Sequence, residues 1–385
     1  MGTKISALTE TGSAPTGAYY PLEYDNANYK ISTETLRDNL GGKYVADWAQ
    51  SHGGEDVANG ATLTITHNLG TADVLAMVYV NSSASDTNAQ EVGMMVHNSA
   101  GQFDCGCLVT SLATNSIVVQ LGEDGYNDIT SGGGLSTTSF SSPTKYIKVV
   151  VLSAGTGLGG RYVADWAQSH GGVAVANTAT LPITHNLGTA NVIVQVFVNS
   201  SASDTNAQTL LNGVQSGTAS VYGAVVTNIT ATEVTLQLGY AGYIDVSSGG
   251  GATQISFSTG PAFIKVVVLA AGASGGGANK YVADWATSHG GTTVDDEATL
   301  AISHDLGTTD FNVSYYVNDA ATDTNAQIVT WDAYPSVSAG AQTTDVSTTG
   351  VTTQLGKNGY VHATSAGQTD FSGWAGKYLK AVFIG

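Results

Sequence analysis

The line "YVADWAQSHGG" constrains this chain more than any other stretch, because it is written three times. It runs from Tyr44 to Gly54, returns unchanged from Tyr162 to Gly172, and appears with one substitution from Tyr281 to Gly291. Self-similarity at a fixed period is typical of chains built from copies of one structural module. An enzyme seldom needs three copies of a site, so the repeat favours a structural role over a catalytic one.

Each copy continues into short segments with the period of β-strands. In the first copy Leu63 and Ile65 alternate with threonines, and a turn at Gly70 precedes a second strand. Alternation of apolar and polar residues is typical of a half-buried strand. The second strand places apolar residues at every other position in all copies: Val74, Ala76, Val78 and Val80; Val192, Val194, Val196 and Val198; Phe311, Val313, Tyr315 and Val317. These patterns predict an all-β fold of three tandem antiparallel β-sandwiches.

Three further features refine this prediction. Pro182 interrupts the first strand of the second copy, and since proline removes a ladder donor, we expect that strand at a sheet edge. A closing strand is expected in "KVVVL" at Lys148 and Lys265 and in "KAVFI" at Lys380. The opening line itself has apolar residues at helical spacing and ends in paired glycines, so it predicts a short helix that leads each sandwich and ends in a glycine C-cap.

Glycine-rich stretches between the copies predict the domain boundaries. "SAGTGLGG" ends at Gly160, and "AAGASGGGAN" ends at Asn279. Such compositions are typical of flexible linkers. We expect a small N-terminal segment over 1–42 and sandwiches over 43–155, 161–272 and 280–385, the last being the most divergent.

Composition limits the partners. The chain has 30 acidic and 12 basic residues, a formal net charge of −18, so nucleic acid is an unfavourable partner. No apolar run reaches the roughly 20 residues of a membrane span, and no export signal opens the sequence, so we expect synthesis in the cytoplasm without membrane insertion. Cys105 and Cys107, separated by one residue, are expected to be free, small apolar side chains.

No repeated pattern indicates catalysis, a metal or a cofactor. Six histidines recur in the copies: His52, His170 and His289 in the opening line, and His67, His185 and His304 in the first strand. The recurring aspartate of the opening line lies off the face of these histidines on a helix, so we expect structural histidines, with His52 suited to a helix C-terminus. "DTNAQ" at Asp86, Asp204 and Asp323 is expected to be a turn whose Asp and Asn bond their own backbone. The chain is therefore predicted to be non-enzymatic.

The segment from Lys4 to Leu40 predicts a strand at Ile5 to Leu8, a Pro/Gly loop, a strand near Tyr29 to Ile31, and a helix from Thr33 that includes Leu36. It resembles the N-terminal anchoring module of tailed-bacteriophage fibre proteins, in its "KISAL" opening, its turn at Pro21 and Leu22, and its "KIS" strand at Lys30 to Ser32. The "ITHNLGT" line of each copy is similar to β-sandwich domains of phage virion and tail-fibre proteins. The resemblance implies a virion component, a head or tail fibre or spike. It also implies a homotrimer that is attached to other virion proteins through Ile5, Leu8, Pro21, Leu22, Ile31 and Leu36.

The chain lacks the heptad coiled coil or collagen-like run of a long fibre shaft, so a short string of globular modules fits it better. One alternative is a bacterial surface adhesin or carbohydrate-binding module. Another is that the three modules fold around one another as a pseudo-trimer within a monomeric protein, since flexible linkers permit either arrangement.

The third copy carries two tryptophans that the other copies lack. Trp331 and Trp374 lie there together with Tyr334, in the copy farthest along the chain from the N-terminal segment. Large aromatic side chains stack on sugars and anchor interfaces at low entropy cost. We therefore expect Trp331, Tyr334 and Trp374 to contact a host-surface glycan or protein, or else to pack in the core or in a trimer seam.

Overall fold

All regular elements in the described part of the chain are β-strands. The computed structural model describes residues 19–24, 27–32, 42–92, 105–130, 134–153, 160–210, 213–215, 220–246, 252–260, 262–270, 280–304, 306–329, 332–334, 337–357, 359–362, 367–369, 371 and 377–384. Every pairing between named strands is antiparallel, and no sheet combines strands from two copies of the repeat. The predicted all-β class is confirmed. The described parts of 43–155, 161–272 and 280–385 are called modules 1, 2 and 3 below.

Each module has a four-stranded and a three-stranded sheet with the same strand order. In module 1 the larger sheet is β3 (Lys43–Ala49), β13 (Tyr146–Ser153), β7 (Val74–Asn81) and β8 (Gln90–Glu91), and the smaller is β6 (Thr62–Thr66), β10 (Ser116–Leu121) and β9 (Cys107–Leu112). Two hairpins complete it, β4 (Ser51–His52) with β5 (Glu55–Asp56) and β11 (Tyr126–Thr130) with β12 (Gly134–Thr138).

Modules 2 and 3 repeat this plan. In module 2 the larger sheet is β14 (Arg161–Ala167), β26 (Phe263–Ala270), β18 (Val192–Asn199) and β19 (Gln208–Thr209), and the smaller is β17 (Thr180–Thr184), β23 (Glu233–Leu238) and β22 (Ala224–Ile229). Its hairpins are β15 (Ser169–His170) with β16 (Val173–Ala174), β20 (Gly213–Gln215) with β21 (Ser220–Tyr222), and β24 (Tyr243–Val246) with β25 (Ala252–Ile255).

Module 3 has the larger sheet β27 (Lys280–Ala286), β39 (Tyr378–Ile384), β31 (Asn312–Asn318) and β32 (Gln327–Val329), and the smaller sheet β30 (Thr299–Ser303), β36 (Gly350–Leu355) and β35 (Ala341–Val346). Its hairpins are β28 (Ser288–His289) with β29 (Thr292–Thr293), β33 (Asp332–Tyr334) with β34 (Val337–Ala339), and β37 (Tyr360–His362) with β38 (Gly367–Thr369). The Tyr315 hydroxyl of β31 lies within hydrogen-bonding distance of Thr343 and Thr353 of the smaller sheet, which joins the two sheets through the core.

The opening line forms a strand and not the predicted helix. In β3 the register against β13 shifts between Ala46 and Ala49, and the same irregularity occurs at the corresponding positions of β14 and β27. A β-bulge inserts an extra residue and shifts the phase of the alternation. The bulge therefore spaces the apolar residues of a strand in a way that imitates a helix.

The paired glycines close a hairpin and not a helix C-terminus. Ser51 pairs with Asp56 and His52 with Glu55, which leaves Gly53 and Gly54 as the two-residue turn between β4 and β5. Both have positive φ, 62° and 89°, as a tight hairpin turn requires. A Cβ on Gly53 would also lie 2.6 Å from the Thr64 carbonyl oxygen, so a side chain has no room there.

The other strand predictions hold. Pro182 lies in β17, which pairs only with β23 and is the edge of its sheet, as predicted. The closing segments form β13, β26 and β39, each paired on both sides. In β7 the predicted inward residues Val74 and Val78 are buried, but so are Leu75 and Tyr79 on the opposite face. A strand with two apolar faces needs a second covering layer.

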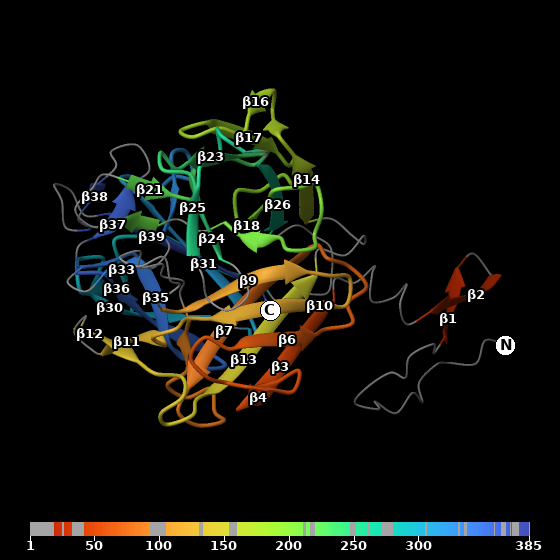
Figure 1. Cartoon of the computed structure of the whole chain (residues 1–385), viewed down its shortest axis with the longest axis horizontal. Helices are drawn as coiled ribbons and strands as arrows, with labels where there is room; N and C mark the ends of the chain where they lie inside the picture. Colours follow the sequence, from red (N-terminus) through yellow and green to blue (C-terminus); the bar gives the residue numbers. More distant parts are fainter. Residues whose placement is uncertain are drawn as a thin grey trace.

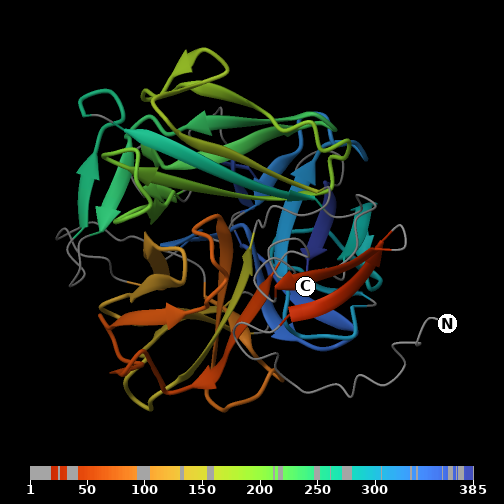
Figure 2. The same ribbon diagram turned by 90° about the vertical axis from the view of Figure 1, so that its right-hand side faces the viewer.

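The neighbouring modules supply that layer. Strand β8 of module 1 packs against β35 of module 3, β19 of module 2 against β9 of module 1, and β32 of module 3 against β22 of module 2. Each module therefore contacts both others, and the three form a closed ring around a common axis (Figures 1 and 2). This arrangement is not the expected string of modules but the alternative in which the three modules fold around one another, because the second apolar face of each large sheet is buried only in the ring.

The N-terminal segment forms a hairpin. Strands β1 (Tyr19–Tyr24) and β2 (Ala27–Ser32) pair with each other in a sheet of their own, and Figure 1 shows them to one side of the ring. The strand expected near Tyr29 is confirmed within β2. The expected turn at Pro21 and Leu22 is wrong, since both lie inside β1, where a two-stranded sheet leaves an open edge that tolerates proline. The strand expected at Ile5 to Leu8 and the helix expected from Thr33 lie outside the described residues.

Candidate functional sites at the ring junctions and the ring axis

A buried lysine in each closing strand organises the contact between two modules. Lys148, Lys265 and Lys380 are at most 1% exposed. A buried ammonium is tolerated only when it is paired and hydrogen-bonded. Each Nζ donates to the aspartate of the "DTNAQ" loop of its own module, Asp86, Asp204 or Asp323.

The tryptophan of the opening line completes this cluster. The Nε1 atoms of Trp48, Trp166 and Trp285 donate to the same three carboxylates over 2.9–3.0 Å. Each lysine Nζ also lies 5.2–5.9 Å from the centre of the indole ring, within the range of cation–π attraction. Three segments far apart in sequence thus meet at one Trp–Asp–Lys cluster, and the cluster occurs once per module.

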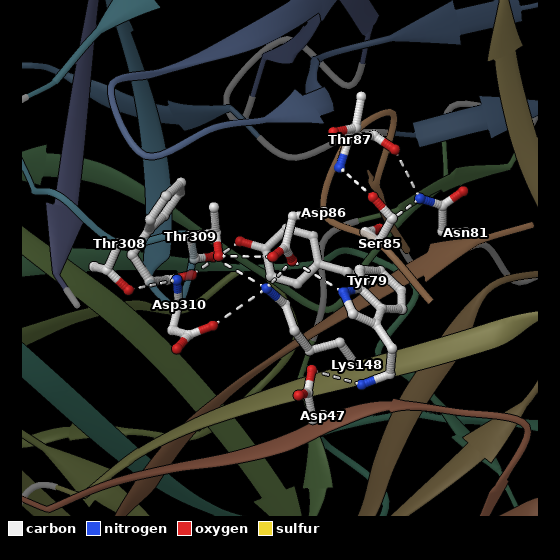
Figure 3. Close-up of polar contacts among 12 residues, drawn as sticks. Asp47, Tyr79, Asn81, Ser85, Asp86, Thr87, Lys148, Thr308, Thr309 and Asp310 are labelled. Carbon is white, nitrogen blue, oxygen red and sulfur yellow. Dashed lines mark hydrogen bonds and ion pairs between the residues drawn. The ribbon is translucent and has the colours of Figure 1, made fainter. Parts of the chain in front are cut away.

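Each cluster reaches into a neighbouring module. Lys148 Nζ lies 3.3 Å from Asp310 Oδ1 of module 3, and Thr309 donates to Asp86 (Figure 3). Lys265 Nζ lies 2.6 Å from Asp73 of module 1, and Lys380 donates to the Asn191 amide oxygen of module 2 over 3.2 Å. The lysine of module 1 thus contacts module 3, that of module 2 contacts module 1, and that of module 3 contacts module 2. Together these contacts close a ring.

The "DTNAQ" loop makes a second contact across each junction. Asn88, Asn206 and Asn325 have φ between 60° and 63°, in the left-handed region that Asn tolerates. Their backbone N–H groups donate to Asp345, Ser111 and Asn228 of the same neighbours. In two junctions a tyrosine adds a third contact: Tyr79 donates to the Phe311 carbonyl over 2.9 Å, and Tyr316 to the Val192 carbonyl over 2.6 Å.

The ionisation of the cluster follows from its geometry. Burial alone would raise the pKa of Asp86, but hydrogen bonds from Lys148 and Trp48 bring it below its usual value. Burial likewise opposes the charge of Lys265, yet hydrogen bonds with Asp204 and Asp73 raise its pKa. Asp86 and Lys265 are therefore held in the charged state, and their polar atoms are engaged within the protein. This arrangement suits a structural clamp.

Sequence reasoning named the members of this cluster but not their meeting. Asp86 was expected to bond its own backbone, whereas its carboxylate accepts from Trp48, Lys148 and Thr309. The "DTNAQ" turn is instead organised by Asn81, whose Nδ2 donates to the carbonyls of Ser85 and Thr87 (Figure 3). A usable signal was present, because a lysine recurs inside an otherwise apolar strand in all three copies.

The repeated histidines bind backbone groups. His52, His170 and His289 have Nε2 within 2.9–3.0 Å of a carbonyl of the closing strand, and each lies in a strand, so the expected helix C-terminus is absent there. His67 and His185 accept the N–H two residues later through Nδ1, and burial lowers the pKa of both. Within the described residues no three His, Cys, Asp or Glu side chains form a metal-binding group. Cys105 and Cys107 are buried and form no disulfide, as predicted.

A cavity of about 210 Å³ lies where the three modules meet. The strands β7, β18 and β31 each contribute to its wall, and so do β8, β9, β19 and β35. The lining is mainly aliphatic, with a few polar side chains that include Glu91, Gln195 and Asn312. The Gln195 amide oxygen accepts the Ala76 N–H over 3.1 Å, so module 2 also bonds module 1 beside the axis.

The residues predicted for attachment and host contact are only partly placed. Leu22 and Pro21 lie in β1 and Ile31 in β2, where Pro21 pairs with Lys30 and Ile31 with Tyr20. Tyr334 ends β33 and pairs with Val337. Trp331, Trp374, Ile5, Leu8 and Leu36 lie outside the described residues.

Comparison with known proteins gives no match: neither a protein-family model nor a curated protein nor a solved structure is significantly similar to this chain. Within its described residues the chain has no helix that is long and apolar enough to cross a membrane.

Proposed function

We propose that this chain is a non-enzymatic structural protein of a bacteriophage virion, a head or tail fibre or spike, attached through its N-terminal segment and displaying the ring of modules. The observation that carries the proposal is the ring itself. Three copies of one module are joined by three polar clusters with the same residue types, and the N-terminal hairpin forms a separate sheet. A repeated, internally clamped body with a separate terminal element is suited to attachment and display.

The ring also bears on the oligomeric state that we propose. A homotrimer of fibre chains presents each surface three times, and the ring of one chain already does so. We therefore favour a single chain at a symmetric attachment site over a homotrimer. Sedimentation of the purified full-length chain distinguishes the two, because a homotrimer of 39.2 kDa chains has three times the mass of a monomer.

Attachment to other virion proteins is assigned to the N-terminal segment. The segment's resemblance to fibre anchors includes Pro21, Leu22 and Ile31, which the hairpin brings into one two-stranded sheet. A two-stranded hairpin is marginally stable alone, so it is expected to dock on a partner. The remaining candidates, Ile5, Leu8 and Leu36, belong to the same proposal.

Host contact is assigned to module 3. Trp331, Tyr334 and Trp374 are proposed to contact a host-surface glycan or protein, because aromatic side chains bind such surfaces at low entropy cost. The alternative function is a bacterial surface adhesin or carbohydrate-binding module, which would share the aromatic site but would not need a virion partner.

The experiment uses full-length chains in phage propagated on its host. A Leu22→Asp, Ile31→Asp variant is expected to fold but to be missing from purified virions, since charge at the hairpin opposes docking. A Tyr334→Ala variant is the matched control, and it is expected to enter virions normally while adsorption weakens. Detection of the chain outside virions only, or normal incorporation of the hairpin variant, would contradict the proposal.

A further inference from the structure

The wall of the axial cavity differs among the modules, whereas the Trp–Asp–Lys cluster recurs in all three. The differing positions can be aligned through the repeat. They are Leu75, Ile193 and Asn312; Glu91, Thr209 and Ile328; and Leu108, Val225 and Gln342. Five of these nine are aliphatic, and the four polar ones, Glu91, Thr209, Asn312 and Gln342, all line the cavity, as do the aliphatic ones except Val225. Corresponding positions of the copies therefore carry aliphatic residues in some modules and polar ones in others.

Three of these polar side chains have an atom without a partner. Thr209 Oγ1, Asn312 Oδ1 and Gln342 Oε1 are buried and make no hydrogen bond within the described residues. The residues are only 8%, 2% and 2% exposed. The Gln342 amide is oriented by its Nε2, which donates to the Glu91 carbonyl, so the oxygen is its free atom. An unsatisfied buried polar group is destabilising, and an aliphatic residue occurs at the same position in another module.

All the unpartnered atoms can accept hydrogen bonds, and a carboxyl group lines the same cavity. A ligand that matches these oxygen atoms donates several hydrogen bonds, and its apolar part packs against the aliphatic lining of the cavity. A primary ammonium has three donors and no acceptor. The cavity volume of about 210 Å³ corresponds to about seven water molecules in the liquid, which is enough for a short alkyl chain.

We propose that the axial cavity is a binding site for a small aliphatic primary amine, whose ammonium N–H groups donate to Thr209, Asn312 and Gln342 and whose charge is balanced by the Glu91 carboxylate. This site is independent of virion attachment and of the aromatic residues of module 3. It uses polar residues of all three modules, so a bound amine connects the modules at the axis and stabilises the closed ring.

The charge state of Glu91 links this binding to pH. Burial raises the pKa of Glu91 to about 7, although hydrogen bonds with Thr343 oppose the shift. The other titratable groups around it are Tyr79, Cys107 and Tyr315, and burial raises the pKa of each far above neutrality, so they stay neutral. A bound ammonium favours the Glu91 carboxylate, so amine binding should release a proton near pH 6 and tighten toward pH 8.

The test is calorimetric titration of the full-length chain with n-pentylammonium, together with its effect on the melting temperature. We expect saturable binding and a higher melting temperature, with weaker effects from 1-pentanol and from tetramethylammonium, which is a cation without N–H donors. The Asn312→Leu and Gln342→Leu variants copy the residues of module 1 and should fold. Each is expected to lower the affinity at least tenfold, and Glu91→Gln should remove the pH dependence.

Three results would overturn the proposal. The first is no saturable binding of n-pentylammonium, which would leave water as the partner of the polar atoms. The second is equal binding of 1-pentanol, which would make the cavity an apolar site. The third is unchanged affinity in both leucine variants, which would place the amine elsewhere on this acidic protein.

Discussion

The ring junctions and the ring axis are both interfaces between the same three modules, but their sequences differ in character. At the junctions, Trp, Asp and Lys recur in every copy, and every lysine is paired with a carboxylate. At the axis, corresponding positions range from leucine to asparagine, and three buried polar atoms lack partners. The junctions close the ring. At the axis the residue type differs among the modules, and ring closure does not require these differences.

The reason for the difference is physical. A buried charge pair depends on every member, because removal of one partner leaves the other charged and desolvated. An aliphatic wall requires only apolar volume, so one residue can be replaced by another of similar size. Polar replacements in this wall lower the stability of the fold. A function for these polar residues would explain why they occur there.

The largest expected effect is at a junction. Asp204→Ala leaves Lys265 buried with one carboxylate fewer and removes the acceptor of Trp166, so we expect the free energy of unfolding to fall by about 3 kcal/mol. Urea denaturation followed by tryptophan fluorescence measures it. Asp165→Ala is the control, since that exposed carboxylate accepts only the adjacent Trp166 N–H, and it should change stability little. Equal effects of the two variants would show that the junction is not a clamp.

The next effect is at Glu91 and depends on pH. The pKa of Glu91 is about 7 in the folded protein, against an ordinary value of 4.5, so the folded state binds more protons between these values. Stability from this group is therefore fully present below pH 4.5 and is lost as pH rises to 7. We expect Glu91→Gln to unfold like the parent at pH 4 and to be more stable by about 2 kcal/mol at pH 8. A constant difference at both pH values would contradict the assignment.

A smaller effect is expected from Asn312→Leu without ligand. The change removes an unpartnered buried amide oxygen and restores the residue of module 1, so we expect stability to rise by about 1 kcal/mol. The reverse change in module 1, Leu75→Asn, should lower it. Thermal unfolding of both variants in amine-free buffer measures the pair, and a loss of stability in Asn312→Leu would show that the asparagine is satisfied.

The smallest effect is expected from Asp73→Asn. Asp73 contacts Lys265 at the junction of modules 2 and 1, and Asn191 occupies the same position at the junction of modules 3 and 2, where it contacts Lys380. The change therefore makes the first junction resemble the second. Lys265 keeps Asp204, so the change in unfolding free energy should stay below about 1 kcal/mol. A loss as large as that of Asp204→Ala would mean that the two carboxylates contribute equally.

Several features of the fold could be predicted from particular residues. The alternation around Leu63 predicted β6, Pro182 predicted a sheet edge, and the apolar run after Lys148 predicted a closing strand. The opening line was wrongly predicted to be a helix, because a bulge between Ala46 and Ala49 changes the phase of the alternation. Periodicity cannot distinguish a bulged strand from one helical turn, since both displace apolar residues from strict alternation.

By itself, the sequence determined the β class, the threefold repeat and the identity of the residues copied in each module, because period and repetition are local properties of a chain. Only the tertiary structure decided that Trp48, Asp86 and Lys148 meet, and that each cluster extends into a neighbouring module. These residues are separated by 38 and 62 positions, and their distance in space depends on how sheets pack. The second apolar face of β7 indicated a missing layer, but only packing showed that the other two modules supply it.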